Sequence, residues 1–232
     1  MDAPRSLFWS AYARVYDLIW DSAFTRAANQ VLFGDCGQAG SVVDLGCGTG
    51  LSSHSLVSLG WHVVGVDASA SMLRRALGLG RVSEVVCADA ADTGLPAAQA
   101  GLVIVNNVLQ LHPRPLDVLS EAARLVAPGG QVVCAWPAPT ATFAQAVRAD
   151  RQAGRAWPPT LAAACLRVAV GIPGALVGAR RWSGEDVAAA VAEFAADRAL
   201  SLSRRGTILG VEDYAVIAIP LHFPVFSTSH KP

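Results

Sequence analysis

Three glycines at alternate positions, Gly46, Gly48 and Gly50, follow the short apolar segment 41–45 and lead into a helix-like pattern that begins at Leu51. A turn without Cβ atoms lets the backbone approach a bound nucleotide closely. The spacing is G-x-G-x-G, and Leu51 stands where the dinucleotide fingerprint G-x-G-x-x-G has its last glycine, which disfavours a nicotinamide-dependent oxidoreductase. Tight turns of this kind also serve packing alone, so a nucleotide site needs support from the other strand ends.

Two aspartates supply that support, because each stands at the end of a further apolar segment. Asp67 closes the segment 62–66 and lies 21 residues after Gly46, where a carboxylate can accept both hydroxyls of a ribose. Asp89 follows the segment 82–87 and can accept a hydrogen bond from an adenine amino group. Asp67 could instead cap a helix, and Asp89 could be a turn residue. In this order after the glycine turn, the two carboxylates predict an adenosine-containing ligand.

Short apolar segments alternate with helix-like segments through the middle of the chain. We expect strands at 41–45, 62–66, 82–87, 102–105 and 131–135, separated by helices at 51–59, from Ser69 onward, and from 116 to the Pro128-Gly129-Gly130 stop. Strands of this kind separated by helices predict a parallel sheet covered on both faces. Ligands bind beyond the carboxyl ends of such strands, so the glycine turn and both aspartates should lie at one edge.

The segments that flank this core also carry structural signals. Residues 7–33 have an aromatic stripe at helical spacing, which predicts one helix that either packs on the core or covers a ligand as a lid. Ser183, followed three residues later by Asp186, predicts a capped helix. The last strands are expected at 200–203 and 214–220, with a turn at 204–206 between them.

The composition narrows the class of protein. With 232 residues, of which 53% are hydrophobic and 16% charged, the chain can bury a substantial core, yet no apolar run is long enough for a membrane span. A formal net charge of zero argues against nucleic acid as a partner. Five scattered cysteines indicate neither a disulfide framework nor a metal site. The N-terminus lacks the pattern of a secretory signal, so we expect a cytoplasmic protein.

Several segments together resemble the successive motifs of the class I S-adenosylmethionine-dependent methyltransferases, of the small-molecule and quinone type. These segments are Val42–Gly50, Val63–Ser69, Cys87–Pro96, Leu102–Pro113 and Glu121–Gly130, and Tyr12–Asp17 is similar to the N-terminal lid of that type. The resemblance implies an α/β fold with a Rossmann-like, seven-stranded, mostly parallel sheet, helices on both faces and the last strand antiparallel. It also implies S-adenosylmethionine as the cofactor.

The resemblance implies that residues 1–232 form a single methyltransferase domain. We expect an N-terminal helical lid at 1–40, a cofactor-binding core at 41–136, a helical insertion that caps the acceptor at 137–182, a closing helix and strands at 183–220, and a tail at 221–232. The oligomeric state is left open between a monomer and a homodimer.

The resemblance also implies a set of cofactor-binding residues. They are Tyr16, Asp44, Gly46, Cys47, Gly48, Gly50, Asp67, Ala68, Met72, Asp89, Ala90 and Asn106. In this reading the glycines pack against the methionine and ribose, Asp67 binds the ribose hydroxyls, and Met72 packs on the adenine. The edge of the adenine is held by Asp89 and the backbone of Ala90.

The remaining members of this set lie toward the methionine end of the cofactor. The resemblance places Asn106 near the sulfonium and Tyr16 near the methionine carboxylate. It also implies that Asp44 orders the glycine turn and reaches the methionine amino group through water. His112 is the candidate general base for an acceptor hydroxyl, and the alternative is a structural residue that begins the helix after the fourth strand.

The acceptor must be inferred from the lid and the insertion. They supply large apolar side chains, namely Trp9, Trp20, Phe143, Trp157, Leu161 and Leu166, which favour an apolar or aromatic small molecule. The segment 106–109 lacks the N/D-P-P-Y/F tetrapeptide of enzymes that methylate amino groups in nucleic acids and proteins. We therefore predict methyl transfer to a small molecule, as in secondary metabolism. The alternative is a non-methylating member that binds the cofactor and acts as a cyclisation catalyst or a partner protein in a biosynthetic pathway.

Overall fold

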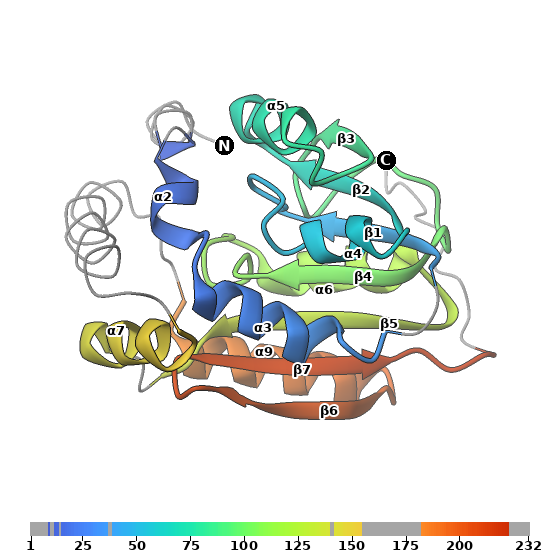
Figure 1. The fold of residues 1–232 in the computed structure, drawn as a ribbon. Helices are drawn as coiled ribbons and strands as arrows, with labels where there is room; N and C mark the ends of the chain where they lie inside the picture. Colours follow the sequence, from blue (N-terminus) through green and yellow to red (C-terminus); the bar gives the residue numbers. More distant parts are fainter. Residues whose placement is uncertain are drawn as a thin grey trace.

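The computed structural model describes residues 9, 12, 13, 15–36, 39–139, 142–154 and 182–222 of the chain. Their centre is a seven-stranded sheet in the order β3-β2-β1-β4-β5-β7-β6 (Figure 1). The strands are β1 Ser41–Leu45, β2 His62–Asp67, β3 Glu84–Cys87, β4 Ala100–Asn106, β5 Val126–Pro137, β6 Ser201–Ile208 and β7 Glu212–Ala218. β1 to β5 are parallel, whereas β7 runs antiparallel to both β5 and β6. The predicted fold class is confirmed.

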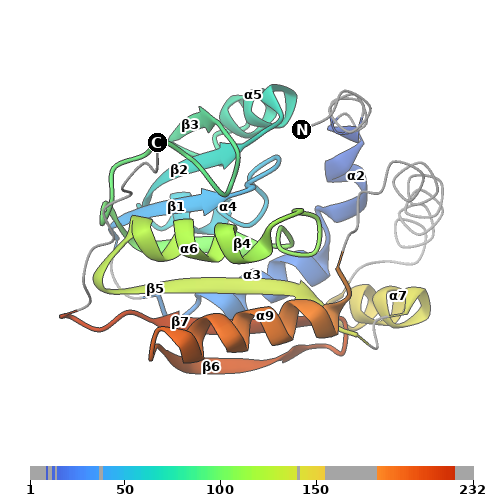
Figure 2. The same cartoon turned by 180° about the vertical axis from the view of Figure 1, so that it is seen from behind.

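Helices cover both faces of this sheet, as the opposite views in Figures 1 and 2 show. α3, α4 and α5 lie on one face and α6 and α9 on the other. The helices are α2 Tyr16–Trp20, α3 Ala23–Phe33, α4 His54–Ser58, α5 Ala70–Gly78, α6 Pro115–Leu125, α7 Phe143–Gln152 and α9 Gly184–Asp197. No described helix has the length and apolar character that a membrane crossing requires.

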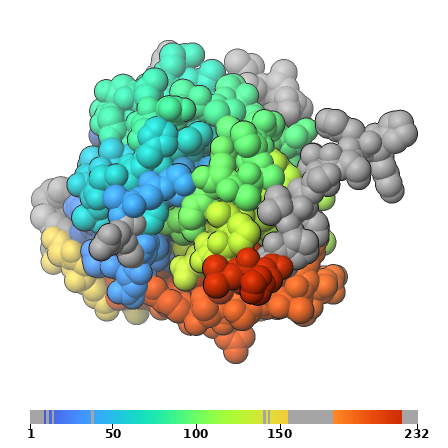
Figure 3. All heavy atoms as spheres, turned by 90° about the vertical axis from the view of Figure 1, so that its right-hand side faces the viewer, coloured from blue at the N-terminus to red at the C-terminus, as the bar shows by residue number. Residues whose placement is uncertain are grey.

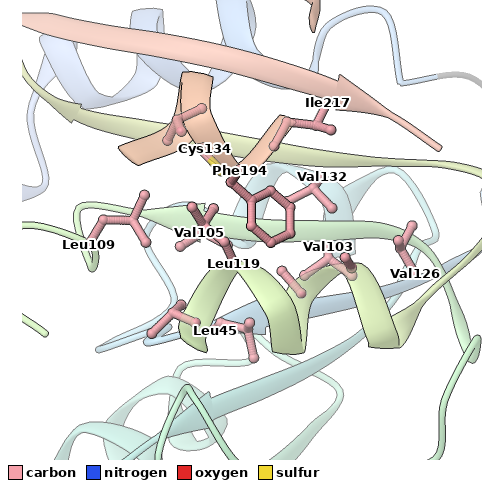
Figure 4. Packing of buried hydrophobic residues seen from close by; sticks show 14 of the residues in the cluster. Leu45, Val103, Val105, Leu109, Leu119, Val126, Val132, Cys134, Phe194 and Ile217 are labelled. Atoms are coloured by element: carbon pink, nitrogen blue, oxygen red, sulfur yellow. The ribbon is translucent and has the colours of Figure 1, made fainter. Parts of the chain in front are cut away.

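The central strand β4 shows why the sheet needs both helical layers. Along β4, Val103 and Val105 point toward the layer of α6 and α9, and Leu102 and Ile104 point toward the opposite layer. All four are at most 2% exposed. Phe194 of α9 inserts between α6 and the sheet and fills the centre of the larger core (Figure 4). Apolar residues in succession thus produce a strand that is buried on both sides.

The N-terminal segment differs from the single helix predicted over 7–33. Within the described residues, α2 ends at Trp20 and α3 begins at Ala23. Ser22 separates them, since its extended backbone stops α2 while its hydroxyl accepts a hydrogen bond from the Thr25 N–H at 3.1 Å. A serine in this position is an N-cap that starts a new helix direction. The aromatic stripe is therefore divided between two helices.

The C-terminal strands also differ from the prediction. Residues 204–206 do not form a turn but lie inside β6, and the turn follows at 209–211, where Leu209 and Gly210 have φ of 49° and 69°. β6 is an edge strand, so the side chain of Arg204 can extend to the Val31 carbonyl, at 2.7 Å. Edge strands tolerate such charged residues.

Two further expectations concern the helices beside β5 and β7. The helix predicted to stop at Pro128-Gly129-Gly130 ends earlier, at Leu125, and β5 begins at once, with a register shift against β4. The capping box of Ser183 and Asp186 is confirmed, and the inward-facing residues of α9 are buried, namely Val187, Val191 and Phe194.

The arrows of β1 and β4 point toward the left-hand side of Figure 1, where α2 and α7 lie. Figure 3 shows the opposite edge of the molecule, with the amino ends of the parallel strands. α7, the first part of the predicted insertion, packs against α3. Residues 155–181, with Trp157, Leu161 and Leu166, lie outside the described residues.

Replacement of Phe194 tests the packing of α9 on the sheet. Phe194 is 2% exposed, so Phe194→Ala leaves a cavity and should lower the free energy of unfolding by about 3–5 kcal/mol in urea denaturation. Leu59→Ala is the control, because Leu59 is 67% exposed and its loss should change stability by less than about 0.5 kcal/mol. Equal effects of the two substitutions would contradict this packing.

Candidate functional site at the carboxyl ends of the strands

The glycine turn follows β1 in a left-handed conformation, with φ of 70°, 56° and 76° at Gly46, Gly48 and Gly50. A Cβ at Gly46 would collide with Val108, and one at Gly50 would come within 2.8 Å of the Cβ of Arg81. A Cβ at Gly48 would meet, among the described residues within 4 Å, the ring of Tyr16 alone, at 3.9–4.0 Å. Gly46 and Gly50 thus serve internal packing, and Gly48 borders space that a ligand can enter.

Asp67 lies beside Gly48 at the end of β2. Its Oδ2 accepts a hydrogen bond from the Gly48 N–H at 2.9 Å, and its Oδ1 accepts one from the Ser69 N–H at 2.8 Å. Burial raises the pKa of Asp67 despite these two bonds. The structure therefore brings together the predicted ribose carboxylate and the open position of the glycine turn. Each carboxylate oxygen retains capacity for a further donor.

Asp44 holds the turn from within the protein. It is 1% exposed, and its carboxylate accepts a hydrogen bond from the hydroxyl of Ser53, the residue before α4. Burial raises the pKa of Asp44 to about 7. The bond connects the end of β1 to the residue before the next helix, across the glycine turn. The role that the resemblance implies for Asp44 stays a prediction.

Tyr16 approaches the turn from the N-terminal segment. Its ring packs edge-on against Tyr12, with 5.2 Å between the ring centroids, and its hydroxyl lies over Gly48. Burial, and after it the nearby Tyr12 and Asp67, raise the pKa of the Tyr16 phenol. The hydroxyl therefore stays protonated and can donate a hydrogen bond to an anionic group.

Four other predicted cofactor residues lie close to this site. Cys47 is buried against Gly65, and burial raises the pKa of its thiol, which makes it unreactive. Ala68 is exposed in the bend after β2. Met72 is 2% exposed and packs with the N-terminal residues beside Tyr16, and Ala90 is 8% exposed at the end of β3. The adenine contacts implied for Met72 and Ala90 stay predictions.

Asp89 and His112, expected to have separate roles, form a pair. His112 Nε2 lies 2.9 Å from Asp89 Oδ1, and His112 Nδ1 accepts a hydrogen bond from the Arg114 N–H at 3.1 Å. Although burial raises the pKa of Asp89, the bonds from the Ala91 N–H and His112 bring it below its usual value. Both ring nitrogens of His112 are engaged in this arrangement, which favours the structural alternative over a general base. His112 lies in the turn before α6, not at the start of the helix.

A network that the sequence did not suggest continues from the end of β4. Asn106 donates a hydrogen bond to the Ser52 hydroxyl at 2.7 Å and accepts one from Asn107 at 2.9 Å. Asn107 has a left-handed φ of 58° and also donates to the carboxylate of Glu212, the first residue of β7. Burial raises the pKa of Glu212 to about 7. The only sequence signal for Glu212 is an acidic residue at the start of an apolar strand.

A groove of about 470 Å³ lies between α3 and α4, on the outer side of the glycine turn. It is lined by Asp21, Thr25, Arg26, Asn29, Gln30, Phe33, Gly34, Leu51, His54, Ser55, Leu59 and Arg81. None of the predicted cofactor residues is among them. We therefore place the candidate site at the strand ends and not in this groove. Gly48, Asp67 and Tyr16 lie together there, and Asp89 follows the neighbouring strand β3.

The comparison with protein families finds a match that includes these strand ends. Residues 43–134 match the family described as "Methyltransferase domain". The matched segment resembles a methyltransferase domain. It extends from the first strand through the glycine turn, Asp67 and Asp89 to Cys134 in β5.

The chain also has relatives among curated proteins. It is 40% identical over 117 residues to trans-aconitate 2-methyltransferase of Azoarcus sp. (strain BH72), a match that covers 49% of this chain and 46% of that protein. It is 38% identical over 122 residues to demethylmenaquinone methyltransferase of Clavibacter sepedonicus, with 50% and 46% covered. The chain therefore spans about half the length of these curated relatives.

Solved structures extend the likeness to most of the fold. The 1,6-didemethyltoxoflavin-N1-methyltransferase of Burkholderia thailandensis, with 1,6-didemethyltoxoflavin and S-adenosylhomocysteine bound, is 18% identical, with 95% of this chain and 92% of that chain covered and a TM-score of 0.61. Magnesium protoporphyrin IX methyltransferase of Synechocystis PCC 6803, with S-adenosylmethionine bound, is 19% identical, with 84% and 77% covered and a TM-score of 0.53. At this identity the likeness establishes the fold.

The buried carboxyl of Glu212 should make stability depend on pH. Its pKa rises from 4.5 to about 7 on folding, so its contribution to stability is complete below pH 4.5 and is lost as the pH rises to about 7. Glu212→Gln keeps an acceptor for Asn107 without the charge. We expect this variant to gain about 1–3 kcal/mol over the wild type between about pH 5 and about pH 8, measured by urea denaturation. If the free energies of unfolding of the variant and the wild type differ by the same amount at both pH values, ionisation of Glu212 does not lower the stability.

Proposed function

We propose that this chain transfers a methyl group from S-adenosylmethionine to an apolar or aromatic small molecule. The observation that carries the proposal is the position of the Asp67 carboxylate beside Gly48, at the carboxyl end of β2 and within the matched methyltransferase domain. Asp89 follows at the end of the neighbouring strand β3. Two carboxylates on adjacent strand ends suit the ribose and the adenine of one adenosine group.

The residues present fit this cofactor. The space beside Gly48 would be restricted by a Cβ, and the Asp67 carboxylate faces the same position. The protonated hydroxyl of Tyr16 can donate to a carboxylate such as that of methionine. Burial raises the pKa of Asp44 and of Asp67, and a ligand with a cationic centre would favour the ionised form of both carboxyl groups. When bound, S-adenosylmethionine supplies a methyl group on a positively charged sulfur.

The role of the protein in such a transfer is to orient two reactants for in-line displacement. Asn106, held by Ser52 and Asn107, stands at the end of β4, beside the glycine turn. It is therefore a rigid polar group on the side where an acceptor would approach. His112 is bound to Asp89, so in this proposal it lies near the adenine and not near the acceptor. The reaction then depends on positioning of the two reactants and not on removal of a proton by His112.

The nature of the acceptor is supported by the relatives and by the composition. The curated relatives are named for small-molecule substrates, trans-aconitate and demethylmenaquinone. The formal net charge of zero disfavours nucleic acid. In the N-terminal segment, Trp9 packs on Tyr12 and Trp20 packs on Tyr16. We infer an apolar or aromatic acceptor, as in natural product biosynthesis. The cytoplasmic location and the choice between monomer and homodimer stay predictions from the sequence.

The function is tested by release of S-adenosylhomocysteine in the presence of phenols, quinols, unsaturated carboxylic acids and heteroaromatic amines. We expect turnover with at least one class, accompanied by calorimetric binding of S-adenosylmethionine. Binding without turnover on any acceptor would favour the non-methylating alternative. An absence of binding would contradict both readings.

Asp67→Ala tests the cofactor site directly. The loss of a charged hydrogen-bond acceptor should weaken S-adenosylmethionine binding by about 1–3 kcal/mol, measured by calorimetry. Asp67→Asn keeps the shape of the side chain but only one acceptor oxygen, so it removes the charge together with one of the two bonds from the Gly48 and Ser69 N–H groups. Asp117→Ala, at a half-exposed carboxylate on α6, should leave the affinity unchanged. An unchanged dissociation constant for both Asp67 variants would contradict the proposal that Asp67 binds S-adenosylmethionine.

A further inference from the structure

Asp17, on the short helix α2, reaches across to three donors of the cofactor core. Its Oδ1 accepts hydrogen bonds from the Thr49 hydroxyl at 2.6 Å and from Arg81 Nη1 at 2.9 Å. Its Oδ2 accepts one from Arg75 Nε at 2.6 Å. The side chain of Asp17 is 11% exposed. These contacts, which we call the Asp17 clasp, join α2 to the glycine turn and to α5.

Arg81 enters the clasp through space left by the third glycine. Its Cβ lies 2.8 Å from the position that a Cβ on Gly50 would take, and its side chain is 11% exposed. Nη1 also donates to the Thr49 carbonyl at 3.3 Å, while Nη2 pairs with Asp21 at 3.3 Å. The absence of a side chain at Gly50 is therefore needed for the clasp itself.

The Asp17 carboxylate is largely buried, and it is paired with the guanidinium groups of Arg75 and Arg81. Burial alone would raise the pKa of Asp17, but the bonds from Thr49, Arg75 and Arg81 lower it overall. A carboxylate with two guanidinium partners is a charge-assisted arrangement, stronger than a lone exposed ion pair. The Asp17 clasp thus stays ionised at neutral pH.

α2 depends on such contacts for its position. The helix comprises five residues, Tyr16–Trp20, and its N-cap residue Val15 makes no capping bond from its side chain. A helix of this length is not stable by itself. Its tertiary anchors are the buried Ile19, at 0% exposed, and the Asp17 clasp. Tyr16, the residue before Asp17, covers Gly48, so the clasp decides where Tyr16 lies.

The order of the strands indicates which part of a ligand Tyr16 would meet. In the sheet order β3-β2-β1-β4, Asp89 ends β3, Asp67 ends β2 and the glycine turn ends β1. A ligand whose adenosine group lies on the two carboxylates would extend its remaining part toward the turn. Tyr16 covers Gly48 in that turn, so we expect it to meet this part of the ligand.

We propose that Asp17 is a positioning residue of the cofactor site, and that the Asp17 clasp holds Tyr16 over the part of the ligand beyond the ribose. This inference rests on the proposed function. It requires that loss of the clasp weakens binding of a ligand that extends past the adenosine, and leaves binding of adenosine itself nearly unchanged.

The test compares calorimetric affinities of the full chain for S-adenosylmethionine, S-adenosylhomocysteine and adenosine. In Asp17→Asn we expect the first two affinities to fall about tenfold, or ~1.4 kcal/mol. In Arg75→Gln, where Arg81 and Thr49 still hold Asp17, we expect a smaller fall of both. In both variants the affinity for adenosine should change less than about twofold. Arg74→Gln is the matched control, since Arg74 is exposed on the same helix as Arg75. It should leave all three affinities unchanged.

The outcomes separate this inference from the proposed function. Equal losses for adenosine and S-adenosylmethionine, or unchanged affinities in both variants, would overturn the positioning role while leaving cofactor binding established. A wild-type chain that binds none of the three ligands would instead overturn the proposed function. If Asp17→Asn fails to fold, Arg75→Gln decides, because Arg81 and Thr49 still hold Asp17 in that variant.

Discussion

The structure depends on a turn of three left-handed glycines that the end of β2 holds in place. The Val66 carbonyl accepts hydrogen bonds from the Gly46 and Cys47 N–H groups at 2.7 and 2.9 Å, and the Asp67 carboxylate accepts one from Gly48. Without these bonds, the conformational freedom of the three glycines would favour disorder of the turn. β2 therefore fixes the shape of the turn and also presents the Asp67 carboxylate beside it. The proposed cofactor site thus depends on the same hydrogen bonds that order the turn.

The same edge of the sheet collects buried carboxyl groups. Burial raises the pKa of Asp44, Asp67 and Glu212, and each holds hydrogen bonds from a neighbouring turn or strand. Such groups lower stability when they ionise, so a fold selected only for stability would replace them. A ligand with a cationic centre and several donors would compensate for their charge. Their concentration at one edge is thus a physical argument for a site there.

Local signals explain what could be predicted from the sequence. The strands follow from runs of valine and isoleucine, and the start of α9 follows from the pair Ser183 and Asp186, because these preferences act within a few residues. The break at Ser22 was not predicted, although its N-cap bond from Thr25 is local, because the aromatic spacing continues across it. The strand through 204–206 was not predicted because it depends on pairing with β7. Glu212 meets Asn107 across 105 residues, and Arg81 meets Asp17 across 64, so no spacing in the sequence could reveal either contact.

These two distant contacts give the glycine turn support from opposite sides. From the N-terminal side, Asp17 holds Thr49 inside the turn. From the side of β4, Asn106 donates a hydrogen bond to Ser52, just after the turn. The next residue, Asn107, donates a hydrogen bond to Glu212. A displacement of α2 or of the start of β7 would therefore change the polar groups that hold the turn. The residues outside the matched segment 43–134 contribute to the site through the turn, and this explains why α2 and β7 belong to the same functional unit as the glycines.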